Sequence, residues 1–460
     1  MNSTRRTIAK NVSSLMVAQI ITWVLALALT VFQPRYLGAA NVGKLQLASS
    51  IWGVMTLLIV FGTDILLTKE IARTPEKTGE LVGTSNVLRM LLFGVSFIVV
   101  SIYVRVVGYP PETIRVIYLV GVSVFIVAVA GSYLAALQGL ERMEYYSISD
   151  VLSKGVITVV TIILLLMGYR VFMVATVMIF GSLIGLVVQF FAVRKYQSLK
   201  FHFDRAKAVW MLQTAFPYLL VSGFLTIYTQ LDVIILSLLL SEESIGYYGV
   251  ANRLFGTFLF VPTVFITALF PVLSRMYSSG SDNMGKLFQK SFEFLFLLSI
   301  PIGLGVFAIS QPVIDLLYGT QFVKSAPILA VLGIVLIFTF QNTLLGRYYI
   351  SIDQQNRWTI VMAAATVVTI PLDIVLIPIC ERVFGNGALG GGFSFLITEA
   401  GMMIAGLIML PKEMLKSQSV SFAIRTLIAG ILMAVVAWQL RNTFLLFPIG
   451  VGGGVYVLTL

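Results

Sequence analysis

Long apolar runs separated by short polar stretches dominate the pattern along this chain. A helix needs about 20 mostly apolar residues to cross a bilayer, and runs of about that length recur from one end to the other. They predict about fourteen membrane-spanning helices, over residues 12–32, 45–67, 81–104, 116–137, 148–167, 171–193, 217–240, 254–273, 287–309, 326–346, 358–378, 388–410, 422–440 and 443–460. The runs are continuous and lack the alternation of barrel strands, so each one is expected to be a helix that satisfies its own backbone. The predicted fold is an all-α integral membrane protein.

The charged residues agree with this prediction. The chain is 58% hydrophobic and only 11% charged, whereas a soluble domain is about 25% charged. When Lys and Arg are counted in alternate loops, 19 fall on the side of the N-terminus and 9 on the other side. Basic residues concentrate on the cytoplasmic side, which predicts a cell-membrane protein with a cytoplasmic N-terminus. The same bias explains the net charge of +11 without a nucleic-acid partner.

A weak internal repeat indicates two related halves. The stretch 42–53 aligns with 245–256 at a spacing of 203 residues, and Gly43, Ala48 and Gly53 recur as Gly246, Ala251 and Gly256. Six spans in each half give both halves the same orientation, with a pseudo-two-fold axis along the membrane normal. The predicted organisation is a six-helix bundle over 1–193, a cytoplasmic linker over 194–216, a second six-helix bundle over 217–410 and two additional helices over 411–460. Transporters with such repeats bind substrate between the halves.

Two segments leave their interpretation open. The basic stretch 194–207 could contact anionic lipid headgroups, although a plain linker explains it equally simply and is favoured. The last apolar run ends at Leu460 after only 18 residues. Either the chain is truncated there or this helix does not fully span.

The sequence lacks the residue patterns that metal binding and nucleotide binding require. The single cysteine, Cys380, and the single histidine, His202, cannot form a typical zinc site. No Gly-rich phosphate loop followed by Lys is present, so neither a metal nor a nucleotide cofactor is expected. The loops on the outer side are short, which argues against an enzyme such as a membrane sugar polymerase or ligase. The pattern favours a carrier.

Ionisable residues within the spans are the candidate functional residues, because charge at that depth is costly. Glu399 lies about 15 Å from either end of its predicted helix, too deep for a short side chain to reach water. It is expected to line a cavity, to pair with a cation or to be protonated. Asp232 either lines the cavity or pairs with a base, for which Arg253 is a candidate.

Basic and acidic residues nearer the ends of the predicted spans are weaker candidates for a functional role. Arg89, next to Asn86, and Lys154 are candidates for the cavity, and Arg35 follows Pro34 at its rim. Two acids are expected to have ordinary surroundings. Asp64 is expected to pair locally with Lys69 or Arg73, and Asp373 is expected to reach water, one turn from the end of its span.

Several short motifs resemble those of polysaccharide repeat-unit flippases, often labelled polysaccharide biosynthesis proteins, of the multidrug/oligosaccharidyl-lipid/polysaccharide exporter superfamily. The first outer loop, the end of the second span, the seventh span and the connection between the eleventh and twelfth spans carry the resemblance. Their residues are Gln33-Pro34-Arg35-Tyr36-Leu37-Gly38, Phe61-Gly62-Thr63-Asp64, Leu231-Asp232-Val233-Ile234 and Gly387-Ala388-Leu389-Gly390 with Thr398-Glu399. Each motif is loose, but their order and spacing extend over nearly the whole chain.

The resemblance implies a flippase that moves a polyprenyl-diphosphate-linked oligosaccharide from the inner to the outer leaflet by alternating access. It implies a coupling cation, H⁺ or Na⁺, and as partners the membrane lipids and a polysaccharide polymerase. On this interpretation Arg35, Arg253, Arg89 and Lys154 would bind the diphosphate, since cations suit phosphate, and Asp232 and Glu399 would couple transport or hold those bases. The alternatives are a cation-coupled multidrug or metabolite antiporter of the same superfamily and a peptidoglycan-precursor flippase, although the first span carries no acid for cation exchange.

Overall fold

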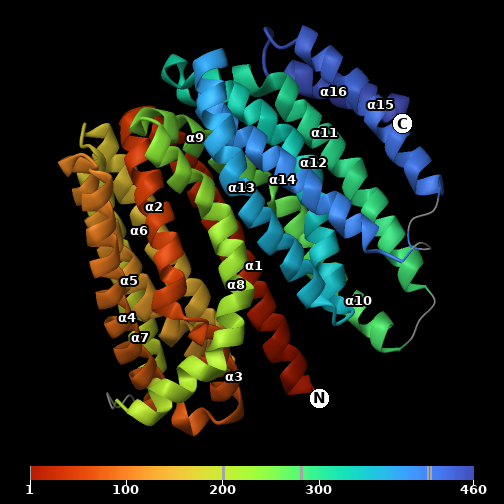
Figure 1. The fold of residues 1–460 in the computed structure, drawn as a ribbon. Coiled ribbons are helices and arrows are strands. Elements are labelled where there is room, and N and C mark those ends of the chain that lie inside the picture. The colour runs from red at the N-terminus through yellow and green to blue at the C-terminus, as the bar shows by residue number, and fades with distance from the viewer. Residues whose placement is uncertain (1, 199–202, 280–282, 412–413, 415–416) are drawn as a thin grey trace. The chain divides into compact units, whose positions relative to one another are not determined.

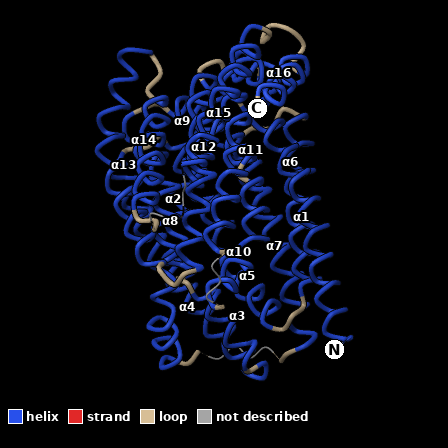
Figure 2. The backbone as a smooth tube through the Cα atoms, turned by 90° about the vertical axis from the view of Figure 1, so that its right-hand side faces the viewer, coloured by secondary structure: helices blue, strands red, loops and turns tan. Residues whose placement is uncertain are grey.

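The described part of the chain consists of helices joined by short loops (Figure 1, Figure 2). The structure is a computed structural model and describes all residues except 1, 199–202, 280–282, 412–413 and 415–416. His202 and part of the basic linker therefore lie outside the described residues. Internal contacts divide the chain into two units, Met1–Ile234 and Ile235–Leu460. This division falls within one long helix, and the bundle and linker boundaries given above remain predictions.

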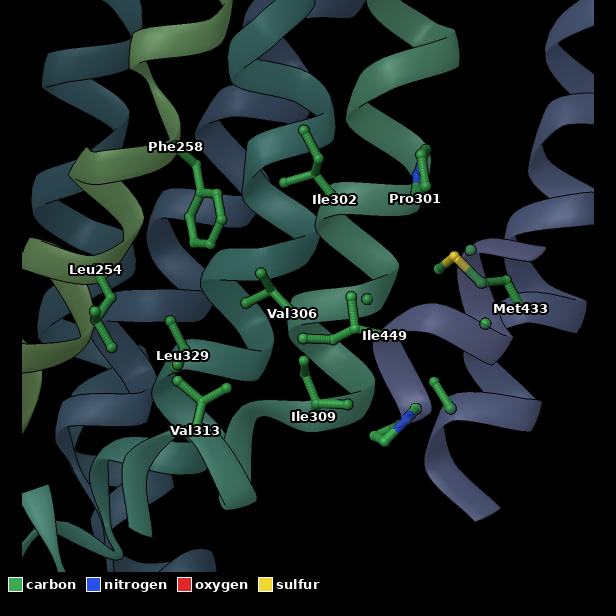
Figure 3. A pocket seen from close by; sticks show the side chains of 15 residues that line it. Leu254, Phe258, Pro301, Ile302, Val306, Ile309, Val313, Leu329, Met433 and Ile449 are labelled. Atoms are coloured by element: carbon green, nitrogen blue, oxygen red, sulfur yellow. The ribbon is translucent and has the colours of Figure 1, made fainter. Parts of the chain in front are cut away.

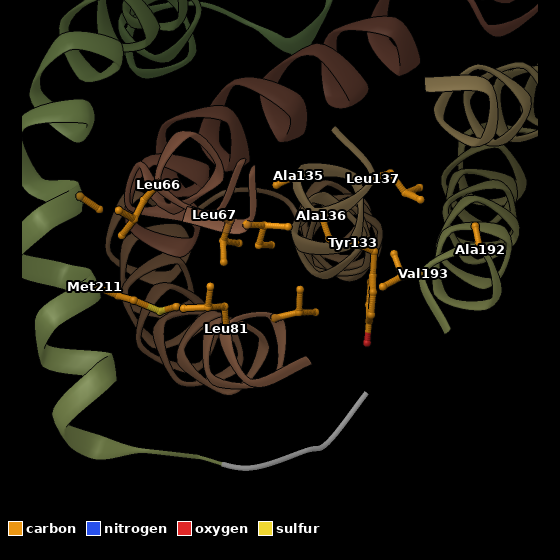
Figure 4. Packing of buried hydrophobic residues seen from close by; sticks show 13 residues of the cluster. Leu66, Leu67, Leu81, Tyr133, Ala135, Ala136, Leu137, Ala192, Val193 and Met211 are labelled. Carbon is orange, nitrogen blue, oxygen red and sulfur yellow. The ribbon is translucent and has the colours of Figure 1, made fainter. Parts of the chain in front are cut away.

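The N-terminal unit contains seven helices and most of an eighth. These are α1 (Asn2–Leu37), α2 (Ala39–Val60), α3 (Thr63–Arg73), α4 (Thr78–Val107), α5 (Pro111–Gly139), α6 (Met143–Leu166), α7 (Val171–Tyr196) and α8 (Arg205–Leu239). Helix α5 is central, since it packs against α2, α3, α4 and α7, while α1 packs along α6. Figure 4 shows part of the core around α5, where Leu66 and Leu67 of α3, Leu81 of α4 and Met211 of α8 converge.

The C-terminal unit contains the remaining eight helices. These are α9 (Glu242–Phe258), α10 (Phe260–Ser278), α11 (Met284–Tyr318), α12 (Ser325–Ser351), α13 (Gln355–Phe384), α14 (Ala388–Ile408), α15 (Ser417–Gln439) and α16 (Leu446–Thr459). Helix α12 is the most enclosed, with contacts to α9, α10, α11, α13 and α14. Helix α15 packs on α11, and α16 packs on α15 and α11, so the two additional C-terminal helices cover one side of this unit.

The predicted all-α membrane fold is confirmed. Within the described residues, twelve helical segments are long and apolar enough to cross a membrane. Two shorter apolar stretches, Thr226–Leu239 in α8 and Leu446–Thr459, lie where the seventh and fourteenth spans were predicted. The chain is therefore a multi-pass membrane protein, and the cytoplasmic position of its N-terminus remains a prediction.

The second predicted span is broken, which the apolar pattern did not indicate. Helix α2 ends at Val60 and α3 begins at Thr63. The two residues between them, Phe61 and Gly62, adopt left-handed conformations with φ of 50° and 71°. Irregular backbone at membrane depth must be satisfied within the protein. Here the Thr63 hydroxyl donates to the carbonyl of Val60 at 2.6 Å, and the break lies against α8, where a Cβ on Gly62 would meet the backbone of Leu219 and Ala215 at 2.8 and 2.9 Å.

The corresponding span of the second half is also interrupted. Helix α9 ends at Phe258 and α10 begins at Phe260. Pro262 has no N–H to donate to the carbonyl of Phe258, which explains the interruption. The aligned stretches of the sequence repeat begin these two interrupted spans, and Trp52 and its counterpart Phe255 are both buried. The structure thus gives the two stretches equivalent places in their units.

Candidate functional site

Arg89 is the most deeply buried basic group among the candidates. It lies on α4 with 1% of its side chain exposed, and its guanidinium forms an ion pair with Asp64 of α3 at 2.5 Å. It also donates to the Thr63 hydroxyl at 2.8 Å and to the carbonyl of Ala128 in α5. Arg89 therefore joins three helices, and its burial keeps it from direct contact with a diphosphate.

The position of Asp64 corrects the expected local pair. Its partner is Arg89, 25 residues away, rather than Lys69 or Arg73. Arg73 instead contacts Glu70 at 3.4 Å. The break before Thr63 turns α3 so that Asp64 faces α4 and α5, and sequence spacing within one continuous helix could not show this.

Glu399 lies in a buried polar cluster of the C-terminal unit. It is 4% exposed, and its Oε2 accepts hydrogen bonds from the Thr339 hydroxyl and the Asn342 amide, each at 2.9 Å. The same amide donates to the backbone carbonyl of Glu399 at 2.8 Å. Thr339 and Asn342 are three residues apart on one face of α12, so this helix fixes the carboxylate of α14 from two positions.

The other four candidates lie in varied surroundings. Arg35, in the last turn of α1, is exposed, whereas Asp232 of α8 is buried and Arg253 of α9 is half-buried. Lys154 of α6 has 51% of its side chain exposed and forms an ion pair with Asp150 one turn earlier, at 2.9 Å. An exposed ion pair of this kind contributes little stability and is easily exchanged for another partner. Since half of its side chain is exposed, Lys154 is accessible to an anion.

Asp373 is the acid that the sequence reasoning placed wrongly. It is fully buried on α13, because this helix continues to Phe384 rather than ending near residue 378. Asp373 therefore lies eleven residues from the helix end, at about 16 Å along the axis. A longer estimate of this span would have put Asp373 among the candidates. No group of three or more His, Cys, Asp or Glu side chains suited to a metal occurs in the described part of the chain.

An apolar cavity of about 400 Å³ opens in the C-terminal unit (Figure 3). Side chains from α9, α11, α12, α15 and α16 line it, including Phe258, Val306, Ile309, Met433 and Ile449. All fifteen lining residues are apolar or glycine. The cavity lies where the additional helices meet α11, and it can receive a flexible hydrocarbon but offers no charge to hold a headgroup.

Comparison with known proteins identifies the family. The model of the family described as "Polysaccharide biosynthesis protein" matches residues 8–277, more than half of the chain. The chain belongs to the polysaccharide biosynthesis protein family. This confirms the resemblance based on the short motifs. A second family model, MatE, matches residues 217–375.

Individual relatives of this family member are distant. It is 22% identical over 375 residues to a probable low-salt glycan biosynthesis flippase, Agl15, of Haloferax volcanii, an alignment that covers 80% of this chain and 76% of the relative. Among solved structures it is similar to the lipid II flippase MurJ in an inward closed conformation, with a TM-score of 0.74, 16% identity and 98% of each chain covered. It is also similar to an inward-facing multidrug resistance MATE family transporter of the MOP superfamily, with a TM-score of 0.66, 15% identity and coverage of 94% of this chain and 100% of that one. At these identities the structures support the fold alone.

Proposed function

We propose that this protein is a flippase that carries a polyprenyl-diphosphate-linked oligosaccharide from the inner to the outer leaflet for surface polysaccharide assembly. The apolar cavity between α11 and the additional helices is the observation that carries the proposal. A polyprenyl carrier is a long hydrocarbon, and transferring it within a protein requires a continuous apolar surface. A cavity of about 400 Å³ is large enough for a substantial ligand segment.

The composition of the cavity favours a lipid tail over a polar metabolite. Ligand sites for small polar molecules contain a few convergent polar side chains that fix orientation. The lining of this cavity contains no polar side chain. The tail would bind here without directional contacts, and the headgroup would be held elsewhere by charged residues.

Accessible cations supply the complementary part of the proposal. Arg35 and Lys154 are both exposed, and guanidinium and ammonium groups bind phosphate oxygens through charge-assisted hydrogen bonds. They are the better candidates for the diphosphate, with Arg253 next, because Arg89 is buried. The relative named as a probable glycan biosynthesis flippase supports the same class of substrate.

A coupling cation is the second part of the proposal. Glu399 and Asp373 are carboxylates buried within α14 and α13, where an ionised acid is expensive. Binding of H⁺ or Na⁺ would neutralise such an acid and would therefore favour one conformation over another. Glu399 is the first candidate, because two donors of α12 orient its Oε2.

Leaflet exchange in liposomes tests the flippase proposal. Purified protein is reconstituted with a fluorescent lipid-linked oligosaccharide, and a membrane-impermeant quencher reports the fraction in the outer leaflet. We expect exchange to be faster than in protein-free liposomes. Exchange no faster than in those liposomes would overturn the proposal.

Two matched glycine variants test whether the cavity takes part in transport. Gly453 lines the cavity, while Gly454 next to it does not, and an added Cβ would meet nothing within 4 Å at either position. Gly453→Leu should fill the cavity and slow the exchange of the glycolipid, whereas Gly454→Leu should not. Equal rates for the two variants would remove the cavity from the mechanism.

A multidrug or metabolite antiporter is the second candidate. The MatE match over residues 217–375 is the observation that favours it. Such an antiporter would move a cationic dye against a cation gradient and would leave a lipid-linked oligosaccharide in its original leaflet.

A further inference from the structure

Asp64 presents an unusual combination of burial and exposure. Its side chain is 45% exposed, although the Arg89 that it pairs with is only 1% exposed. Arg89 contacts one carboxylate oxygen, Oδ1. Within the described residues Oδ2 has no hydrogen-bond partner, so its acceptor sites are open.

The depth of Asp64 determines what its open side can face. It lies nine residues before Arg73, the end of α3, which places it about 13 Å along the helix from that end. A carboxylate exposed to acyl chains within a span would be strongly unfavourable. The exposed face of Asp64 must therefore meet water or a polar ligand rather than lipid.

Arg89 decides which ligand the carboxylate can accept. The guanidinium is held by Thr63 and by the carbonyl of Ala128, so its positive charge stays beside Asp64. A fixed positive charge at this position repels a second cation. Asp64 is thus a poor site for a metal cation, whereas its carboxylate can accept hydrogen bonds from a neutral ligand.

Polar groups next to Asp64 extend the acceptor surface. Thr68, one turn later on α3, is half-buried and lies 3.4 Å from Oε1 of Gln138 on α5. On α5, Gly131 leaves room beside the ion pair, since a Cβ there would come within 3.1 Å of Arg89 and 3.5 Å of Asp64. The result is a small polar surface on two helices, with neutral donors and acceptors beside one fixed carboxylate.

We propose that Asp64 is a glycan-binding residue, whose carboxylate accepts hydrogen bonds from sugar hydroxyls of the substrate during transport. A sugar carries many hydroxyl donors and no charge that Arg89 would repel, and hydroxyl donors form their strongest hydrogen bonds with ionised acceptors. Thr68 and Gln138 complete the polar surface on which the sugar lies. Arg89 acts as a positioning residue that orients the carboxylate. The inference rests on the proposed flippase function and adds a residue that binds the glycan.

Two ligands prepared from one extract test the proposal. The lipid-linked oligosaccharide is extracted from the host membrane, and part of it is stripped of its glycan to give the polyprenyl diphosphate. Binding of each ligand to the detergent-solubilised full chain is measured for the wild type and for Asp64→Asn. We expect Asp64→Asn to bind the glycolipid about tenfold more weakly and to bind the polyprenyl diphosphate as the wild type does.

Controls separate the outcomes. Glu76→Gln removes an exposed acid of the same unit and should change neither affinity. If Asp64→Asn does not fold, Asp64→Asn with Arg89→Met removes both charges together, and the same selective loss is expected. Equal weakening for both ligands, or no weakening for either, would overturn the role of Asp64. A wild type that binds neither ligand would instead contradict the flippase proposal itself.

Discussion

The buried guanidinium of Arg89 shows how strongly one residue can constrain this fold. It is held by an acid, a hydroxyl and a backbone carbonyl from α3 and α5. Sequence reasoning identified Arg89 as a candidate because a charge within a span is rare. It could not identify the partner, because Asp64 lies on another helix beyond a backbone break, while Lys69 and Arg73 are nearer in sequence.

A double-mutant cycle on this pair gives the first prediction. Asp64→Asn leaves a buried cation without its counter-charge, and breaking a buried pair in this way costs about 3–5 kcal/mol. The exposure of Asp64 places the cost at the lower end of that range. Asp64→Asn with Arg89→Met should be destabilised less than the sum of the two single variants, measured as melting temperatures in detergent. Additive losses would show that the two side chains do not interact.

The second prediction concerns the buried carboxylate of Glu399. Glu399→Gln removes the charge but keeps an oxygen that accepts from Thr339 and Asn342, so the protein should reach the membrane at normal abundance. If the carboxylate binds the coupling cation, glycan export should fall at least tenfold and lose its dependence on the cation gradient. Gradient-dependent export at the wild-type rate, with Glu76→Gln as a control for loss of an acid, would exclude this role.

At the scale of elements, hydropathy predicted the helices well and their interruptions poorly. The spans over 81–104 and 171–193 correspond to the cores of α4 and α7. The break at Phe61 was not predicted because the apolar run continues through it. Its left-handed residues are stabilised by contact with α8, which no local pattern reveals. The same limit explains Asp373, since α13 extends six residues past the predicted end of its span.

The contact between the break and α8 gives an element-scale prediction. Gly62 and Gly108 both have positive φ, 71° and 77°, but their surroundings differ. A methyl group added at Gly62 would lie within 3 Å of neighbouring backbone, whereas one added at Gly108 would meet nothing within 4 Å. Gly108→Ala should therefore cost only the strain of its conformation, about 1–2 kcal/mol. Gly62→Ala should cost more, because α8 must move away, and should lower the melting temperature further. Equal shifts would show that α8 does not hold the break.

At the scale of the whole molecule, the sequence predicted a carrier from what is absent as much as from what is present. Short outer loops, few charges and no cofactor motif argued against the common membrane enzymes, and the short motifs predicted the family that the comparison confirmed. The apolar cavity could not be predicted, because its lining comes from five helices spread over residues 254–453. The substrate and its coupling ion remain proposals that rest on this cavity and on the charged residues.

Transport of two cargoes by the same proteoliposomes separates a flippase from an antiporter in a single measurement. One population carries a fluorescent lipid-linked oligosaccharide, the other a cationic dye, and both are followed with an imposed cation gradient and without it. A flippase of the proposed kind should exchange the glycolipid at a rate well above that of protein-free liposomes and should leave the dye at its passive leak. Transport of the dye with no exchange of the glycolipid would show that the protein is not a flippase.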